Sequence, residues 1–276
     1  MIKIENLGFC YGENIVLKNI TMTLQEGRIY GLLGENGVGK TTLLTLLCGL
    51  KKPMAGSIEI DCMKPFDRKP SLLSAIYYLS DEVAEANMTA VEYAENYGKF
   101  WVGFDYDKFM EVMSIMENDP QKKMNQMSFG QLKKTHIAFA LACNTKYLFM
   151  DEPTNGLDIP SKSQFRKALM KFTREDSTLL ISTHQVRDLE NVIDPIIILD
   201  KQQVLLNASV QEISEKLYFD YGNEPDPAAL YREMTPGGNI QVTVNTEMKE
   251  SKVNLEALFN TAHQHKELMK SIFTKE

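Results

Sequence analysis

A glycine-rich stretch between two apolar runs constrains the fold of this chain more than any other feature. Residues 34–42 read Gly-Glu-Asn-Gly-Val-Gly-Lys-Thr-Thr and directly follow the apolar run at residues 29–33. The glycines allow a tight turn in which successive backbone N–H groups can point at phosphate oxygens. Lys40 would place a point charge on the β- and γ-phosphates, and Thr41 would supply a hydroxyl to Mg²⁺. The sequence therefore predicts a strand, a phosphate-binding loop and a helix, in that order.

The alternative for this stretch is an ordinary glycine-rich turn that caps a helix. The strand before it and the leucines after it, at positions 43, 44, 46 and 47, favour the phosphate loop. The helix expected at about residues 40–48 would direct its positive end at the same anion. The chain is therefore expected to bind a nucleoside triphosphate. The nucleotide-binding residues predicted in the loop are Gly34, Glu35, Asn36, Gly37, Val38, Gly39, Lys40, Thr41 and Thr42.

Composition limits the classes of protein to which the chain can belong. Its 276 residues carry a net charge of −7 without long runs of one sign, which argues against a nucleic-acid partner. No apolar stretch reaches membrane-spanning length and no signal-peptide core is visible, so we expect a cytoplasmic protein. The cysteines at positions 10, 48, 62 and 143 form no metal-binding pattern.

The order of apolar patterns indicates an α/β fold with a helical insertion. Strands are expected at residues 2–11, 15–24, 28–33, 57–61, 75–80, 147–150, 178–182, 195–199 and 203–207. Helices are expected at residues 89–100, 105–117, 128–142, 159–172 and 186–191. Strands that alternate with helices predict a largely parallel sheet, and residues of about 85–145 would interrupt it as a helical subdomain.

The sequence pattern changes after about residue 208. We expect a main domain at residues 1–208 and a C-terminal extension of unassigned role at residues 209–276. Within the extension, residues 224–226 and 235–239 are rich in turn formers, residues 240–244 could form a strand, and residues 255–273 could form one amphipathic helix.

Two acids follow the apolar run at residues 147–150. A buried strand would deliver Asp151 and Glu152 to the carboxyl edge of the sheet, where phosphates lie in such folds. Asp151 suits the role of holding Mg²⁺, and Glu152 that of polarising an attacking water. The pattern is weak alone, because strands often end in acids, but the phosphate loop upstream makes it informative.

Together these residues resemble the nucleotide-binding subunit of ATP-binding cassette (ABC) transporters, of bacterial exporter type. Residues 34–42 match the Walker A motif, and residues 151–158 are similar to Walker B and the D-loop. Residues 127–131, Met-Ser-Phe-Gly-Gln, resemble the family signature Leu-Ser-Gly-Gly-Gln, and residues 182–184, Ser-Thr-His, resemble the switch-histidine motif. The resemblance implies a P-loop cassette with a mixed β-sheet core, the inserted helical subdomain and a small C-terminal extension.

The resemblance also implies roles and partners. ATP and Mg²⁺ would bind between two cassettes, as a homodimer or heterodimer, because the signature of one subunit closes on the γ-phosphate held by the Walker A motif of the other. Ser128, Gly130 and Gln131 would supply that contact, and Ser128 is expected to cap a helix. The resemblance further implies that Tyr11 stacks on adenine, that Thr41 and Asp151 hold the metal, and that Glu152 and His184 are catalytic.

Two positions depart from the family pattern. The family has a glutamine after the strand that resembles residues 75–79, and Asp81 is the best positional match for it here. We predict Asp81 as a further metal ligand, while a merely solvated loop is the alternative. Phe129 replaces the first glycine of the signature, so its ring must point away from the phosphate.

Two functions remain open at this stage. The first is an ATP-hydrolysing subunit that lies on the inner face of the membrane through a separate integral permease and drives transport by ATP-dependent dimerisation. The alternative is a non-transport regulatory module that senses ATP with low turnover. His184 could instead be a satisfied histidine, and Tyr11 an ordinary strand aromatic.

Overall fold

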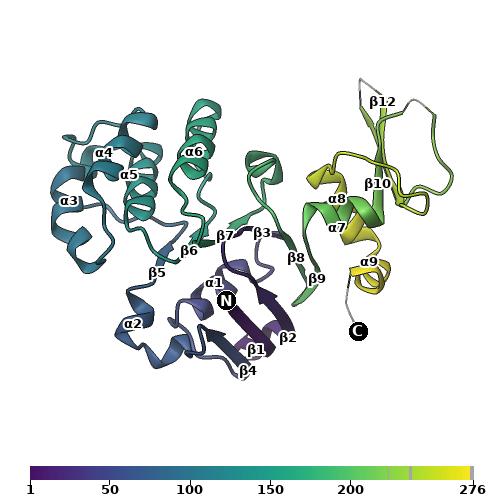
Figure 1. Cartoon of the computed structure of the whole chain (residues 1–276), viewed down its shortest axis with the longest axis horizontal. Helices are drawn as coiled ribbons and strands as arrows, with labels where there is room; N and C mark the ends of the chain where they lie inside the picture. The colour runs from purple at the N-terminus through teal and green to yellow at the C-terminus, as the bar shows by residue number, and fades with distance from the viewer. Residues whose placement is uncertain (223, 236–237, 274–276) are drawn as a thin grey trace.

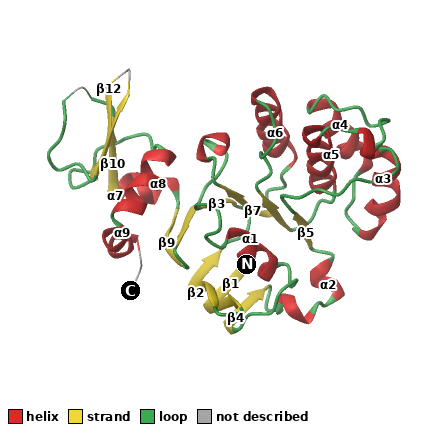
Figure 2. Ribbon diagram, turned by 180° about the vertical axis from the view of Figure 1, so that it is seen from behind, coloured by secondary structure: helices red, strands yellow, loops and turns green. Residues whose placement is uncertain are grey.

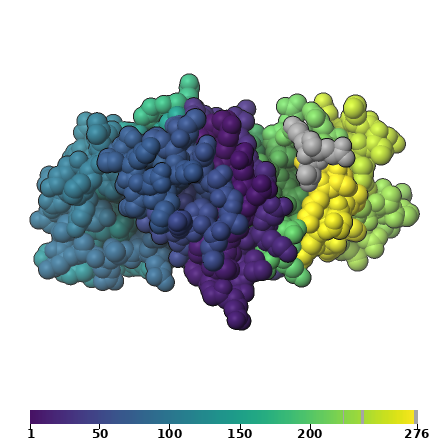
Figure 3. Space-filling model, turned by 90° about the horizontal axis from the view of Figure 1, so that it is seen from below, coloured from purple at the N-terminus to yellow at the C-terminus, as the bar shows by residue number. Residues whose placement is uncertain are grey.

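The computed structural model describes residues 1–222, 224–235 and 238–273. Figures 1 and 2 show an elongated molecule in which a twisted central sheet separates a group of helices at one end from the C-terminal part of the chain at the other. Figure 3 shows the same three blocks in a row as a space-filling surface. The central block carries the predicted phosphate loop.

The central sheet is largely parallel, as the sequence predicts. Its strands lie in the order β5-β6-β7-β3-β8-β9, and only the last pair, β8 and β9, is antiparallel. The strands are β3 (Ile29–Leu33), β5 (Ile76–Leu79), β6 (Tyr147–Asp151), β7 (Thr178–Thr183), β8 (Ile196–Asp200) and β9 (Gln203–Ala208). Because both faces are covered, the central strands are continuous apolar runs rather than alternating ones.

A second, antiparallel sheet lies below the first (Figure 1), with the order β2-β1-β4. It consists of β1 (Ile2–Tyr11), β2 (Asn14–Leu24) and β4 (Ala55–Ile60). Helix α1 (Lys40–Leu47) packs between the two sheets, since its leucines share one apolar core with residues of β1 and with Phe149 and Leu180 of the central sheet. The short helix α2 (Pro70–Leu73) leads into β5.

Helices α3 (Ala90–Tyr97), α4 (Tyr106–Ile115), α5 (Phe129–Ala142) and α6 (Ile159–Phe172) form the group at one end of the sheet (Figures 1 and 2). Polar side chains start them: Thr89, Asp105, Ser128 and Asp158 each accept a hydrogen bond from the backbone N–H three residues later. Two predicted helices are shorter than expected. The first ends at Tyr97 and continues as a 3₁₀ turn over Gly98–Phe100, and residues 186–191 form only a 3₁₀ turn, Val186–Leu189.

The C-terminal part contains more structure than the sequence indicates. Its sheet has the order β10-β12-β11, and its elements are α7 (Val210–Lys216), β10 (Leu217–Asp220), β11 (Tyr231–Thr235), β12 (Gly238–Val244), α8 (Leu255–Gln264) and α9 (Lys266–Phe273). The prediction of one helix at residues 255–273 is wrong. His265 leaves the helical conformation and its Nε2 lies 2.7 Å from the carbonyl oxygen of Leu230, which separates α8 from α9.

The predicted division at residue 208 stays a prediction, although β9 ends at Ala208 and α7 begins at Val210. Residues 236 and 237 of the turn expected at 235–239 lie outside the described residues. Within the part that is described, no helix is long and apolar enough to cross a membrane.

The C-terminal part is attached to the central sheet through Asp200, the last residue of β8. Its buried carboxylate lies 3.2 Å from His263 Nδ1 and 2.5 Å from Lys266 Nζ. His263 Nε2 also lies 3.9 Å from a carboxylate oxygen of Glu35 in the phosphate loop. The extension therefore contacts the side of the sheet where the loop is found.

His136 makes folding sensitive to acid. It is buried on α5, its Nε2 lies 2.9 Å from the carbonyl oxygen of Ala84, and burial lowers its pKa below the ordinary value of histidine. The unfolded chain therefore binds a proton at a higher pH than the folded chain does, and the free energy of unfolding falls as the pH drops below the unfolded pKa of about 6.5.

We expect the variant His136→Gln to lose less stability on acidification than the wild type does. Denaturant unfolding of both proteins at about pH 7 and about pH 5.5 checks this, because the other titrating groups are common to the two chains. Parallel losses of unfolding free energy in the two proteins would contradict the prediction.

Candidate functional site

The phosphate loop joins β3 to α1 and requires glycine at its last turn. Gly39 caps α1 in a left-handed conformation with φ of 112°. A Cβ atom at this position would also lie 3.0 Å from side-chain atoms of Val16 and Leu17. Only glycine combines this backbone conformation with so close a contact to β2. The helix can therefore start at Lys40 with its N–H groups turned toward the loop.

Lys40 is almost fully buried beneath the loop. Its ammonium donates to the carbonyl oxygens of Gly34, at 2.7 Å, and Glu35, at 3.2 Å, and lies 3.3 Å from Glu152 Oε1. A lysine in this position brings one positive charge to the interior of the loop while the surrounding oxygens satisfy it.

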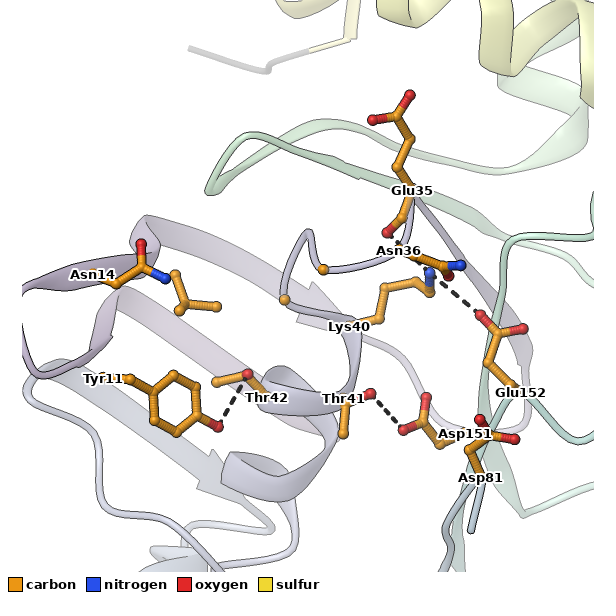
Figure 4. Close-up of a pocket in the computed structure, with 13 residues that line it drawn as sticks. Tyr11, Asn14, Glu35, Asn36, Lys40, Thr41, Thr42, Asp81, Asp151 and Glu152 are labelled. Carbon is orange, nitrogen blue, oxygen red and sulfur yellow. Dashed lines mark hydrogen bonds and ion pairs between the residues drawn. The ribbon is translucent and has the colours of Figure 1, made fainter.

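A pocket of about 390 Å³ lies on this loop, and Figure 4 shows the side chains that point into it. This volume is typical of sites for small molecules. Its lining residues are Tyr11, Asn14, Val16, Glu35, Asn36, Gly37, Gly39, Lys40, Thr41, Thr42, Asp81, Asp151 and Glu152. The structure thus brings most of the predicted loop residues together with the three predicted acids, although Gly34 and Val38 do not line the pocket.

Asp151 ends β6 and is buried at the bottom of the pocket. One of its carboxylate oxygens accepts a hydrogen bond of 2.6 Å from the Thr41 hydroxyl, and the other accepts one from Ser182 of β7. The phenol of Tyr78 lies 3.4 Å from the same carboxylate, and burial, with Asp151 next in effect, raises the pKa of that phenol so that it remains a donor. A buried carboxylate beside a hydroxyl provides the hard oxygen donors that Mg²⁺ prefers.

Thr41 and Asp151 suit Mg²⁺ better than they suit other metal ions. Among the residues that the structure describes, no group of three or more His, Cys, Asp or Glu side chains could hold a metal ion by itself. Mg²⁺ usually binds one or two carboxylates together with waters and substrate phosphates. Thr41 and Asp151 are sufficient protein ligands for such a site.

Glu152 has a strained backbone next to this carboxylate. Its φ of 44° lies in the left-handed region, which costs a non-glycine residue on the order of 1–3 kcal/mol. Its side chain is nearly buried and bridges two groups, with Oε1 facing Lys40 and Oε2 3.0 Å from His184 Nδ1. His184 does not itself line the pocket, so it reaches the site through Glu152.

Tyr11 ends β1 at the other side of the pocket. Its hydroxyl lies 3.4 Å from the Thr42 hydroxyl, its ring is half-exposed, and the ammonium of Lys51 lies 4.9 Å from the ring centroid. The ring is therefore available as a flat apolar surface at the mouth of the pocket (Figure 4).

Asp81 lies at the wall of the pocket but already has partners. One carboxylate oxygen lies 3.2 Å from Lys133 Nζ, and Asn155 donates to both oxygens at 3.1 and 3.3 Å. Its predicted role as a metal ligand stays a prediction.

The second predicted cluster is separate from the pocket. Ser128 and Gln131 form a reciprocal cap at the start of α5: Gln131 N–H donates to the Ser128 hydroxyl at 3.3 Å, and Ser128 N–H donates to the Gln131 side chain at 3.1 Å. Ser128 is exposed, and neither it nor Gly130 nor Gln131 lines the pocket of its own chain. The capped end of α5 therefore lies outside the pocket of its own chain.

Phe129 packs on the turn after β6, and the predicted direction of its ring relative to a phosphate stays a prediction. Its half-exposed ring lies so close to Gly156 that a Cβ atom there would come within 2.4 Å of the ring. Gly156 also has a positive φ of 76°, so the turn accepts the ring only because it carries no side chain.

Sequence reasoning missed several residues of the site. Ser182 holds Asp151, and the pairing of Asp151 with Ser182 in adjacent parallel strands could have indicated this contact. Four other residues of the site belong to no sequence motif, because each reaches the site from a distant segment of the chain. They are Asn14, Val16, Tyr78 and Lys133.

Comparison with known proteins places the chain among nucleotide-binding cassettes. The family described as ABC transporter matches residues 17–155. The bacitracin transport ATP-binding protein BcrA of Bacillus licheniformis is 31% identical over 211 residues, 74% of this chain and 68% of that protein. The lantibiotic transport ATP-binding protein SrtF of Streptococcus pyogenes is 28% identical over 208 residues, 75% of this chain and 90% of that protein.

A solved structure agrees with these sequence matches. The ATP-binding cassette MJ0796, in a dimeric post-hydrolysis state bound to ADP and Pi, matches with a TM-score of 0.65 and 27% identity. The match covers 76% of this chain and 98% of that one.

We expect Lys40→Met to weaken nucleotide binding about 10- to 100-fold, the effect of losing a charge-assisted hydrogen bond at a buried site. Equilibrium binding of a fluorescent ATP analogue measures it. Lys69→Met, an exposed lysine before α2, is the matched control and should bind like the wild type. Undiminished affinity in Lys40→Met would show that the loop does not hold the phosphates.

Proposed function

The chain belongs to the ABC transporter family of ATP-binding cassettes, and from that membership we propose that it hydrolyses ATP to drive a substrate through a separate membrane permease. The membership confirms the resemblance and the fold class predicted from the sequence. The observation that carries the proposal is the convergence of Lys40, Asp151 and Glu152, from three different elements, on one pocket.

In this proposal the phosphate loop holds the triphosphate. The amides of residues 34–42 and the ammonium of Lys40 bind the phosphates, and the start of α1 adds its positive end. Tyr11 supplies the ring beside adenine, which its half-exposed position at the mouth of the pocket supports.

The metal would be held by the hydroxyl of Thr41 and the carboxylate of Asp151. Bound Mg²⁺ supplies neutralisation of the charge on the β- and γ-phosphates. Ser182 and Tyr78 also donate to the Asp151 carboxylate and help to fix its position. Ligation by Asp81 would require its carboxylate to leave Lys133 and Asn155.

Glu152 would act as the base that orients and deprotonates the attacking water. Its carboxylate lies at the pocket, and Lys40 and His184 fix its two oxygens. His184 would hold the carboxylate in position and contact the γ-phosphate when the site closes.

A second cassette would complete the site. Ser128, Gly130 and Gln131 lie away from the pocket of their own chain, and the exposed helix end that they form suits an anion from outside. The dimeric cassette MJ0796 bound to ADP and Pi supports a pairing of this kind, either of two copies of this chain or of this chain with a related cassette. ATP would then stabilise the closed pair through contacts that the open pair lacks.

The permease would be a separate integral membrane protein, and this chain would lie on its cytoplasmic side. The names of the bacitracin and lantibiotic transport relatives favour a peptide antibiotic as the substrate.

A second candidate is a regulatory module that binds ATP with little turnover and does not drive transport. The observation that favours it is the engagement of Asp81 by Lys133 and Asn155, because the family has a glutamine at this position. The two candidates differ in the rate of ATP hydrolysis.

We expect Glu152→Gln to lower kcat for ATP hydrolysis about 10²- to 10⁴-fold, the usual contribution of a general base. Its ATP affinity should be unchanged, and ATP should convert it to a stable dimer. A coupled-enzyme assay and sedimentation with and without ATP measure these quantities. Glu95→Gln, on the exposed face of α3, is the matched control.

A different experimental result would contradict each step of the proposal. Equal and slow turnover in the wild type and in Glu152→Gln, with ATP-driven dimers in both, would favour the regulatory module. A monomer that persists in ATP would reject the shared site. Normal turnover in Glu152→Gln would reject Glu152 as the base.

A further inference from the structure

A fully buried lysine of α5 contacts Asp81 at the wall of the nucleotide pocket. Lys133, on the first turns of α5, has no exposed side-chain surface. Its ammonium donates to the carbonyl oxygen of Asp81 at 2.6 Å and to that of Ser80 at 3.5 Å, and it lies 3.2 Å from Asp81 Oδ1. These contacts give each of its three N–H groups a partner.

The carboxylate of Asp81 stabilises the charged form of the lysine. Burial lowers the pKa of the Lys133 ammonium, and the carboxylate of Asp81 is the strongest influence in the opposite direction, followed by Asp151 and Glu152. A buried cation is costly without its anion, whereas removal of both charges together is often well tolerated. Lys133 and Asp81 therefore behave as one unit, and Lys133 also lies close enough to the pocket to interact with its acids.

The same lysine connects three segments of the chain. Asn155, in the turn after β6, donates to both carboxylate oxygens of Asp81. The ring of Phe129 has its centroid 5.9 Å from the Lys133 ammonium and packs on Gly156 of that turn. The start of α5, the loop after β5 and the turn after Glu152 thus form one cluster of contacts.

We propose that Lys133 is a positioning residue, which fixes the start of α5 to the pocket wall at Asp81 and so sets where Ser128 faces the nucleotide of a partner cassette. The inference rests on the proposed function, because it concerns the shared site. The two positions that depart from the family pattern, Asp81 and Phe129, are the two side chains that Lys133 contacts. In this assignment Asp81 balances Lys133 and does not ligate the metal.

The test compares Lys133→Met, Asp81→Asn and the double variant. Methionine keeps the apolar stem of lysine without its charge, and asparagine keeps the size of aspartate. Lys134→Met is the matched control, because this neighbouring lysine bonds to Met116 and Gln164 and makes no contact with Asp81. For each protein, kcat, KM for ATP, the Mg²⁺ concentration for half-maximal activity and the denaturant midpoint are measured.

We expect Lys133→Met to lower kcat about 10- to 100-fold, the effect of a misplaced group in an assembled site. Nucleotide affinity and the Mg²⁺ requirement should stay at the wild-type values. The double variant should have the kcat of Lys133→Met alone, because the two residues act through each other. Lys134→Met should match the wild type in kcat, in KM for ATP and in the Mg²⁺ requirement.

Two results would overturn the proposal. One is a wild-type kcat in folded Lys133→Met. The other is a raised Mg²⁺ requirement in the double variant relative to Lys133→Met, which would make Asp81 a metal ligand. This second comparison also serves if Asp81→Asn alone does not fold. The double variant carries neither charge, and the Asp81 carboxylate that remains in Lys133→Met is 38% exposed and keeps its hydrogen bonds from Asn155. Failure of the proposed function is separate, because it would appear as absent ATP turnover in the wild type itself.

Discussion

The parallel pairing of β3, β6 and β7 brings most of the charged groups of the pocket to one edge of the sheet. In this register Asp151 is opposite Ser182 and Leu33 is opposite Thr183, so the loops after the three strands leave the sheet at one edge. The phosphate loop, the two acids and His184 all follow directly from these strand ends. A slip of one residue in the pairing of β6 with β7 would turn Asp151 to the other face of the sheet and separate it from Thr41.

Charge balance determines how this edge can stay folded. Four carboxylates line one pocket, those of Glu35, Asp81, Asp151 and Glu152, and like charges at close range destabilise one another. The fold places the buried ammonium of Lys40 against Glu152 and that of Lys133 against Asp81, while hydroxyl groups satisfy Asp151. The site therefore combines a strong local field with few unsatisfied polar groups.

Sequence reasoning succeeded where the signal is local. The phosphate loop, the strand that ends in Asp151 and the caps at Ser128 and Asp158 each depend on a few consecutive residues, and the structure places the corresponding elements where the sequence predicts them. Sequence reasoning failed where contacts between distant segments of the chain determine the local structure. The break at His265 depends on the carbonyl group of Leu230, and the partner of Asp81 is Lys133 on another element. The short α7 and strands β10 and β11 were missed because they have too few residues to show a period.

The left-handed conformation of Glu152 has a consequence for any attempt to stabilise this protein. Glycine adopts that conformation without a steric penalty, so the backbone alone favours glycine at the position where the chain carries an acid. Substitutions that only relieve this backbone strain would therefore remove the carboxylate. Thermal robustness and turnover oppose each other at this one residue, as is common where a backbone is held in an unfavourable conformation beside a reacting group.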